Sequence, residues 1–137
     1  MPSLFKKLFQ KSEAPKDDGL TQPQREAIVD LLNYCTYADN SVMLAEDRLI
    51  TDTVAKFNWD PKAAPFDQFD ARSVGNARNA RESQVYRAKF LASIKDRLGT
   101  AEVKGQALDL CKELFIADGA FADEEDEVFQ DLRKLLE

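Results

Sequence analysis

Residues 38–47 of this chain read ADNSVMLAED, and residues 117–126 read ADGAFADEED. A shift of 79 positions aligns residues 24–57 with residues 103–136 without a gap, and most of the identical positions lie in these two stretches. Before the first stretch, Ile28, Leu31, Leu32 and Cys35 recur at the spacing of one helical face. We therefore predict that each copy consists of two helices joined by a turn.

The residues of the predicted turn agree in type between the two copies. Asn40 aligns with Gly119, and Asn and Gly are the residues that most readily adopt the left-handed backbone conformation that follows many helices. Val42 aligns with Phe121, so that an apolar side chain follows each turn. We expect these pairs to shape the turns, and two such units can pack around a pseudo-twofold axis.

The rest of the chain also shows helical patterns. Thr21 is the predicted N-cap of the first helix, with Pro23 in the first turn and Gln24 at the capping-box position. Residues 66–81 and 85–98 are predicted to form two central helices, the second ended by Gly99. The expected inner face of that second helix is Val85, Ala88, Leu91, Ile94 and Leu98.

No stretch alternates strictly between apolar and polar residues, as a half-buried strand would. The predicted fold class is all-α. The expected architecture is a compact helical bundle with two pseudo-repeated helix–loop–helix units (about 24–57 and 103–136) plus central helices.

Composition limits the chemistry that the chain can perform. The 137 residues suffice for one domain with a hydrophobic core. The chain contains no His, which excludes imidazole bases, imidazole metal ligands and the Ser-His-Asp or Cys-His arrangements of nucleophilic enzymes. Cys35 and Cys111 are each isolated in a helical pattern, so both are expected to be small buried residues. We expect no enzyme, since only carboxylate or metal-bound water chemistry would remain.

Residues 1–19 differ from the rest and are predicted to be an N-terminal amphipathic segment with a linker, before a helical domain at 20–137. Leu4, Phe5, Leu8 and Phe9 fall on one side of a helical wheel, with lysines interleaved. Residues 4–11 therefore suit weak membrane contact or docking onto a protein. The alternative is that they are a frayed terminus or a helix folded onto their own domain. No apolar run would cross a bilayer and no signal peptide is recognisable, so we expect a cytoplasmic, membrane-proximal protein.

The formal net charge of −6 disfavours nucleic acid as a partner. Positive charge is nevertheless concentrated between residues 71 and 97, and negative charge between residues 109 and 127. The basic central region contains Arg72, Arg78, Arg81, Arg87, Lys89, Lys95 and Arg97. This basic central face is expected either to be solvated or to meet an anionic surface of a partner.

Asp39 and Glu46 place one carboxylate at the end of a helix and another at the start of the next, and Asp118 and Glu125 repeat this spacing. In one interpretation, these carboxylates accept hydrogen bonds from amides of the turn and of the first helical turn. In the other, they ligate Ca²⁺ or Mg²⁺, through one loop or through both. Neither copy fits the EF-hand pattern. All four acids are therefore candidate metal ligands.

At these residues the chain resembles the TerB-like family, bacterial tellurite-resistance proteins whose helical domain carries A-D-G-x5-E signatures at its turns. Ala117, Asp118 and Gly119 with Glu125 fit the signature, and the first copy departs from it at Asn40. The resemblance covers residues 20–137. It implies a role in tellurite resistance and chemical-stress responses, metal binding through the acids of the motif, and membrane-associated protein partners of the TerC type.

Two functional hypotheses follow. The first is a non-enzymatic, tellurite-resistance-like stress-response domain that binds a divalent cation through its acidic helix–loop–helix turns and docks onto protein partners. The alternative is a metal-free protein–protein interaction module, in which the acids cap the turns and the basic central face contacts the partner.

Overall fold

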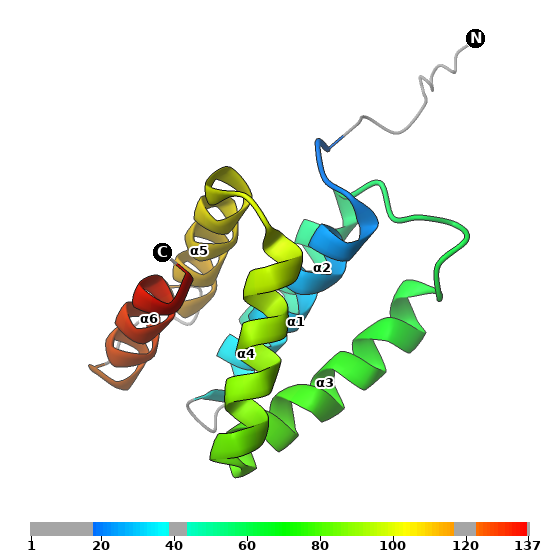
Figure 1. Cartoon of the computed structure of the whole chain (residues 1–137). Coiled ribbons are helices and arrows are strands. Elements are labelled where there is room, and N and C mark those ends of the chain that lie inside the picture. The colour runs from blue at the N-terminus through cyan, green and yellow to red at the C-terminus, as the bar shows by residue number, and fades with distance from the viewer. Residues whose placement is uncertain (1–17, 39–43, 117–122, 137) are drawn as a thin grey trace, which may run out of the picture.

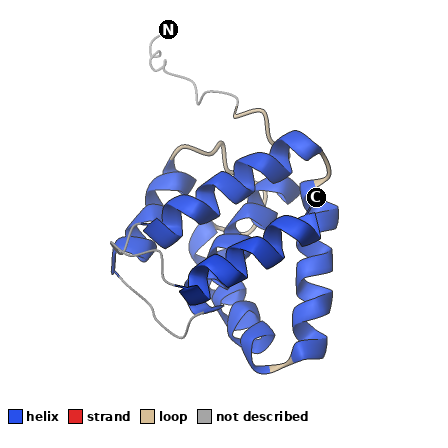
Figure 2. Ribbon diagram, turned by 90° about the vertical axis from the view of Figure 1, so that its left-hand side faces the viewer, coloured by secondary structure: helices blue, strands red, loops and turns tan. Residues whose placement is uncertain are grey.

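The computed structural model describes residues 18–38, 44–116 and 123–136, and every regular element within them is an α-helix (Figures 1 and 2). The helices are α1 (Gln22–Ala38), α2 (Leu44–Ala55), α3 (Phe66–Glu82), α4 (Gln84–Leu98), α5 (Ala101–Ile116) and α6 (Asp123–Leu136). The predicted all-α fold, a compact helical bundle, is confirmed.

The predicted capping box at the start of α1 is confirmed. The backbone N–H of Gln24 donates to Oγ1 of Thr21 at 3.3 Å, and the N–H of Thr21 donates to Oε1 of Gln24 at 2.9 Å. Nε2 of Gln24 also donates to the carbonyl of Leu98 at 3.0 Å. Gln24 of the capping box therefore also attaches the end of α4 to the start of α1. The local sequence did not indicate this second contact.

α1 is the central helix of the bundle. The predicted stripe of Ile28, Leu31, Leu32 and Cys35 is confirmed, with each residue at most 1% exposed. Burial extends further than this stripe, because all residues from 27 to 36 are buried. α3 and α4 cover one side of α1, and α5 lies on another (Figure 1). A helix that is buried all round requires partners for its polar side chains as well.

The two central helices are found where the sequence predicts them, but the predicted inner face of α4 is partly wrong. Val85 is 69% exposed and Ala88 is exposed as well. The buried residues of α4 are Phe90, Ile94 and Leu98. Ser83 caps α4 by accepting a hydrogen bond from the N–H of Tyr86 at 3.1 Å, so Val85 lies in the exposed first turn. The buried positions of α3 are small or polar, which explains its weak apolar pattern: Ser73, Ala77 and Ala80.

α1 and α5 run in the same direction. The start of α1 lies beside the end of α4, through the bond from Gln24 to Leu98, and α5 follows directly. Further along both helices, Sγ of Cys35 donates to Sγ of Cys111 at 3.4 Å. The C-terminal ends of α1 and α5 therefore lie at the same end of the bundle (Figure 1).

The helix starts also follow the sequence repeat. α5 begins 79 positions after α1, and α6 begins 79 positions after α2. Thr100 caps α5, since its Oγ1 accepts a hydrogen bond from the N–H of Val103 at 3.2 Å. The turn residues Asn40, Val42, Gly119 and Phe121 lie outside the described residues, and the pseudo-twofold relation of the two units stays a prediction.

The connection between α2 and α3 packs against the core through an aromatic cluster. The Trp59 ring meets the Phe66 ring edge-on, with centroids 5.4 Å apart, and Trp59 Nε1 donates to the carbonyl of Ala64 at 3.1 Å. Both rings are partly buried against the core, in line with the core role that large aromatic side chains usually have.

We predict opposite stability changes for two Gly→Ala substitutions. Gly99 ends α4 with φ of 79°, so Gly99→Ala places a Cβ in a left-handed conformation and should lower the free energy of unfolding by about 1–2 kcal/mol. Gly75 lies within α3 and an added Cβ meets no atom within 4 Å, so Gly75→Ala should raise it by about 0.5–1 kcal/mol. Urea denaturation measures both. Changes of the same sign would contradict the assigned helix end.

Candidate functional site

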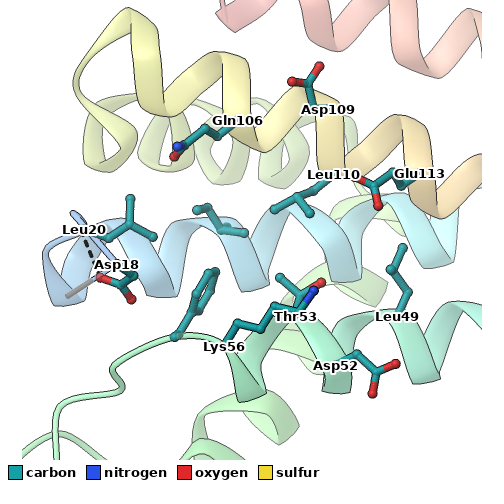
Figure 3. A pocket seen from close by; sticks show the side chains of 12 residues that line it. Asp18, Leu20, Leu49, Asp52, Thr53, Lys56, Gln106, Asp109, Leu110 and Glu113 are labelled. Carbon is teal, nitrogen blue, oxygen red and sulfur yellow. Dashed lines mark hydrogen bonds between the residues drawn. The ribbon is translucent and has the colours of Figure 1, made fainter. Parts of the chain in front are cut away.

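A groove of about 490 Å³ lies between α1, α2 and α5 (Figure 3). We call it the α1–α2–α5 groove. Its lining residues are Asp18, Leu20, Ile28, Leu49, Asp52, Thr53, Lys56, Phe57, Gln106, Asp109, Leu110 and Glu113. Apolar side chains from all three helices and from the segment before α1 therefore meet acidic ones in a single open groove.

The walls of the groove combine an apolar interior with acidic edges. Leu49 from α2 and Leu110 and Glu113 from α5 point toward one another across the groove, whereas Asp52 and Asp109 point outward from its two sides (Figure 3). Asp52, Asp109 and Glu113 are exposed, and Leu49 and Leu110 are half-buried. The groove thus offers apolar contact inside and negative charge at its edges.

The groove exists because the two sequence copies are covered differently. On α1, the positions 79 residues before the α5 wall are all buried: Ala27, Asp30, Leu31 and Tyr34. Their counterparts on α5 are Gln106, Asp109, Leu110 and Glu113, and these line the groove. α3 and α4 pack on α1, and no described helix covers the matching face of α5 to the same extent. The open face of α5 therefore corresponds to a face of α1 that other helices bury.

The sequence itself indicates that the aligned faces of α1 and α5 differ in burial. Where the first copy has Ala27 and Tyr34, the second has Gln106 and Glu113. Replacement of two apolar residues by polar ones on one helical face indicates that this face is less buried in the second copy. Leu110, on the same face of α5, is only partly buried.

Asp18 fixes one end of the groove. Its carboxylate accepts two hydrogen bonds from the Arg25 guanidinium, both at 2.8 Å, and one each from the N–H groups of Leu20 at 3.0 Å and Asn58 at 2.8 Å. The hydrogen bonds from Arg25, together with the two backbone donors, hold the pKa of Asp18 well below its usual range despite burial. Asp18 therefore joins the chain before α1 to the connection after α2.

A second polar cluster lies on the opposite side of α1, where α3 and α4 pack. Asp30, only 4% exposed, accepts hydrogen bonds from Oγ of Ser73 at 2.6 Å and from Nη2 of Arg97 at 2.7 Å. Nδ2 of Asn33 donates to Oγ of Ser73 at 3.0 Å and to Asp70 at 2.9 Å. A polar cavity of about 310 Å³ adjoins this cluster. The hydrogen bonds give the cluster a structural role, since they attach α3 and α4 to α1.

The four predicted metal ligands fall at the edge of what the structure describes. Asp39 and Asp118 lie outside the described residues. Glu46 and Glu125 are each the third residue of their helix, α2 and α6, and their side chains also lie outside the described part. Among the residues that are described, no group of three or more Cys, Asp and Glu side chains is arranged to hold a metal ion.

Cys35 and Cys111 were predicted to be separate buried residues, and both are buried at 0% exposure. The contact between their Sγ atoms was not predicted. A shift of 79 positions does not align them with each other, so the repeat gave no reason to pair them. Their contact is a consequence of the parallel packing of α1 and α5.

Most arginines of the predicted basic central face have contacts within the chain. Arg97 binds Asp30, and Arg87 donates to the carbonyls of Ala80 at 2.9 Å and Arg81 at 3.1 Å, at the end of α3. The guanidinium of Arg78 lies over the Tyr37 ring, and that of Arg72 lies over Phe69. These residues therefore hold the helices together as well as carrying charge.

Comparison of the chain with family models, curated proteins and solved structures found no match. Within residues 18–38, 44–116 and 123–136, no helix has the length and apolar character needed to cross a membrane.

The Asp18 interactions make a pH-dependent contribution that can be measured. Asp18→Asn should lower the free energy of unfolding by about 1–3 kcal/mol at neutral pH, because the Arg25 guanidinium loses its charged partner. Because the folded-state pKa of Asp18 is lowered from 3.8, the carboxylate stabilises the fold above that value and loses this effect as the pH falls below it. Urea denaturation from pH 7 to pH 2 should therefore show the two proteins converging at low pH. Asp96→Asn, at an exposed position, is the control, and a constant difference for Asp18→Asn would contradict the assignment.

Proposed function

We propose that this chain is a non-enzymatic docking domain whose α1–α2–α5 groove binds a cationic amphipathic helix of a protein partner. The observation that carries the proposal is the groove itself, in which apolar side chains are bordered by exposed acids. An amphipathic helix buries its apolar face in such a groove while its charged residues remain at the edges. Opposite charge at those edges orients the partner and speeds its association.

The repeat supports a helix as the bound element. The face of α1 that corresponds to the groove wall is buried by packed helices, and Asp30 there is paired with Arg97 of α4. On α5 the corresponding Asp109 is exposed. A partner helix in the groove would therefore take a position like that of the central helices on α1, and a basic residue on it would have Asp109 as a partner.

The cellular role that we propose rests on the resemblance to the TerB-like family. The signature at residues 117–125 supports a bacterial stress-response function of the tellurite-resistance type, with membrane-associated partners. The basic central face stays an alternative contact surface, with Arg72, Arg78 and Lys89 exposed. We favour the groove because it combines apolar contact with charge, whereas four arginines of the basic face already have contacts within the chain.

Charge reversal in the groove tests the docking function. A fluorescent synthetic helix with Leu at positions i, i+1, i+4 and i+5 and Lys elsewhere should bind the full chain, as measured by anisotropy. Asp109→Lys with Glu113→Lys should weaken this binding about tenfold, because two attractive edge charges become repulsive. Asp96→Lys with Glu102→Lys changes the net charge equally at exposed positions outside the groove and should leave binding within about twofold. Equal affinities for the two variants would reject the groove as the binding site.

A divalent cation is the second candidate ligand, and the direction of α1 and α5 favours it. The chain leaves both helices at the same end of the bundle to enter its two acidic segments (Figure 1). Glu46 and Glu125 hold the same position in the helices that follow. This arrangement supports ligation by both turns together, with Asp39 and Asp118 completing a carboxylate set that suits Ca²⁺ or Mg²⁺.

Calorimetric titration of Ca²⁺ and Mg²⁺ into the chelator-treated chain tests this candidate. We expect binding in the wild type and at least a tenfold loss in Asp118→Asn with Glu125→Gln. The matched control is Asp52→Asn with Asp131→Asn, an exposed pair related by the same 79-residue shift, which should bind like the wild type. The thermal midpoint should rise with cation concentration, because a ligand of the folded state stabilises it. Absence of both heat and stabilisation would reject the cation site.

A further inference from the structure

We infer that the α1–α2–α5 groove binds the chain's own N-terminal segment, residues 4–11, and that a partner helix must displace this segment. The inference rests on the docking function proposed above and names how the same groove is regulated. Three observations carry it: where the described chain begins, how long the segment and its linker are, and how its residues match the groove.

The described chain begins at the groove. Asp18 and Leu20 line one end of it, and the bonds to Arg25 and Asn58 fix Asp18 there. Six residues, 12–17, join Lys11 to Asp18, and an extended chain of that length spans about 20 Å. The α5 wall runs from residue 106 to 113, which is about 10 Å of helix. The opposite wall runs from residue 49 on α2 to residue 57, just after the end of that helix. The segment can therefore reach the whole groove while Asp18 keeps its place.

The apolar residues of the segment match the apolar part of the groove in length. Leu4, Phe5, Leu8 and Phe9 would form a stripe about 7.5 Å long on one face of a helix. This stripe fits within the two helical turns of the α5 wall, and Leu49 and Leu110 point toward the groove (Figure 3). Burial of these side chains supplies the favourable free energy that a segment of this length lacks in water on its own.

The charges of the segment and the groove are opposite. Lys6, Lys7 and Lys11 give the segment three positive charges. The groove is edged by Asp52, Asp109 and Glu113, with Lys56 as the one basic residue in its lining. The lysines would lie beside the stripe, toward acids that point outward from the two walls (Figure 3). Attraction of this kind also explains why the segment would prefer this groove to the basic central face.

When the segment occupies the groove, a partner helix can bind there only by displacing it. A segment that is joined to its binding site by only a few residues has an effective concentration in the millimolar range. Even modest intrinsic affinity then keeps the groove covered, and the apparent affinity for a partner falls by the fraction of chains in the open state. Release of the segment would also expose its own amphipathic face. Binding of a partner in the groove would therefore make the cationic residues 4–11 available for another contact.

Methyl NMR of the full chain tests this inference. Leu8→Asp with Phe9→Asp should remove the segment from the groove and shift the methyl resonances of Leu49 and Leu110. The matched control is Ser3→Asp with Gln10→Asp, which makes the same charge change on the opposite side of the helical wheel and should leave those resonances as in the wild type. A synthetic peptide of residues 1–11 should bind the Leu8→Asp, Phe9→Asp chain and restore the resonances. It should bind the wild type at least tenfold more weakly.

The outcomes separate this inference from the docking function. Self-docking is overturned if the methyl resonances of Leu49 and Leu110 are identical in the wild type and in the Leu8→Asp, Phe9→Asp variant. If the peptide then binds both proteins equally, the docking function of the groove is still supported. Peptide binding to neither chain overturns both. If the Leu49 and Leu110 methyl shifts depend on protein concentration and light scattering detects a dimer, the segment of one chain binds the groove of a second copy. Binding of the wild type to anionic vesicles without any change in the groove resonances would assign the segment to a membrane, and either result rejects self-docking.

Discussion

The complete burial of α1 from residue 27 to residue 36 is the constraint on which the rest of the structure depends. Apolar side chains on all sides of this helix require neighbours on all sides, and α3, α4 and α5 provide most of them. Burial also encloses Asp30 and Asn33, which would be costly without partners. Arg97 and Ser73 meet this requirement for Asp30, so the polar residues of α1 determine which parts of α3 and α4 lie against it.

The groove is a consequence of the same constraint. The central helices lie on α1, and the matching face of α5 remains open. Asp30 and Asp109 are identical at equivalent positions of the two copies, yet one is buried in an ion pair and the other is exposed at the edge of a groove. The face of α5 that lines the groove therefore remains open where the aligned face of α1 is covered, and our functional proposals concern what binds to the open face.

The predictable part of the fold was local. The capping box at Thr21, the end of α4 at Gly99 and the buried stripe of α1 all depend on residues within one or two helical turns of each other. The inner face of α4 was assigned wrongly at Val85, because two competing apolar faces exist on that helix and only packing against α1 selects one. The groove was not predicted, since it depends on three helices and on the segment before α1, which are far apart in the sequence.

By itself, the sequence determined the helices, their caps and the repeat of 79 residues, because short-range hydrogen bonds and the 3.6-residue period act within each segment. It also determined the absence of His and the acidic and basic character of separate regions. Only the tertiary structure decided that α1 and α5 run in the same direction, that Cys35 meets Cys111, and that Asp109 remains exposed where Asp30 is buried. These outcomes depend on which helical faces become buried, and this is decided only when all the helices pack together.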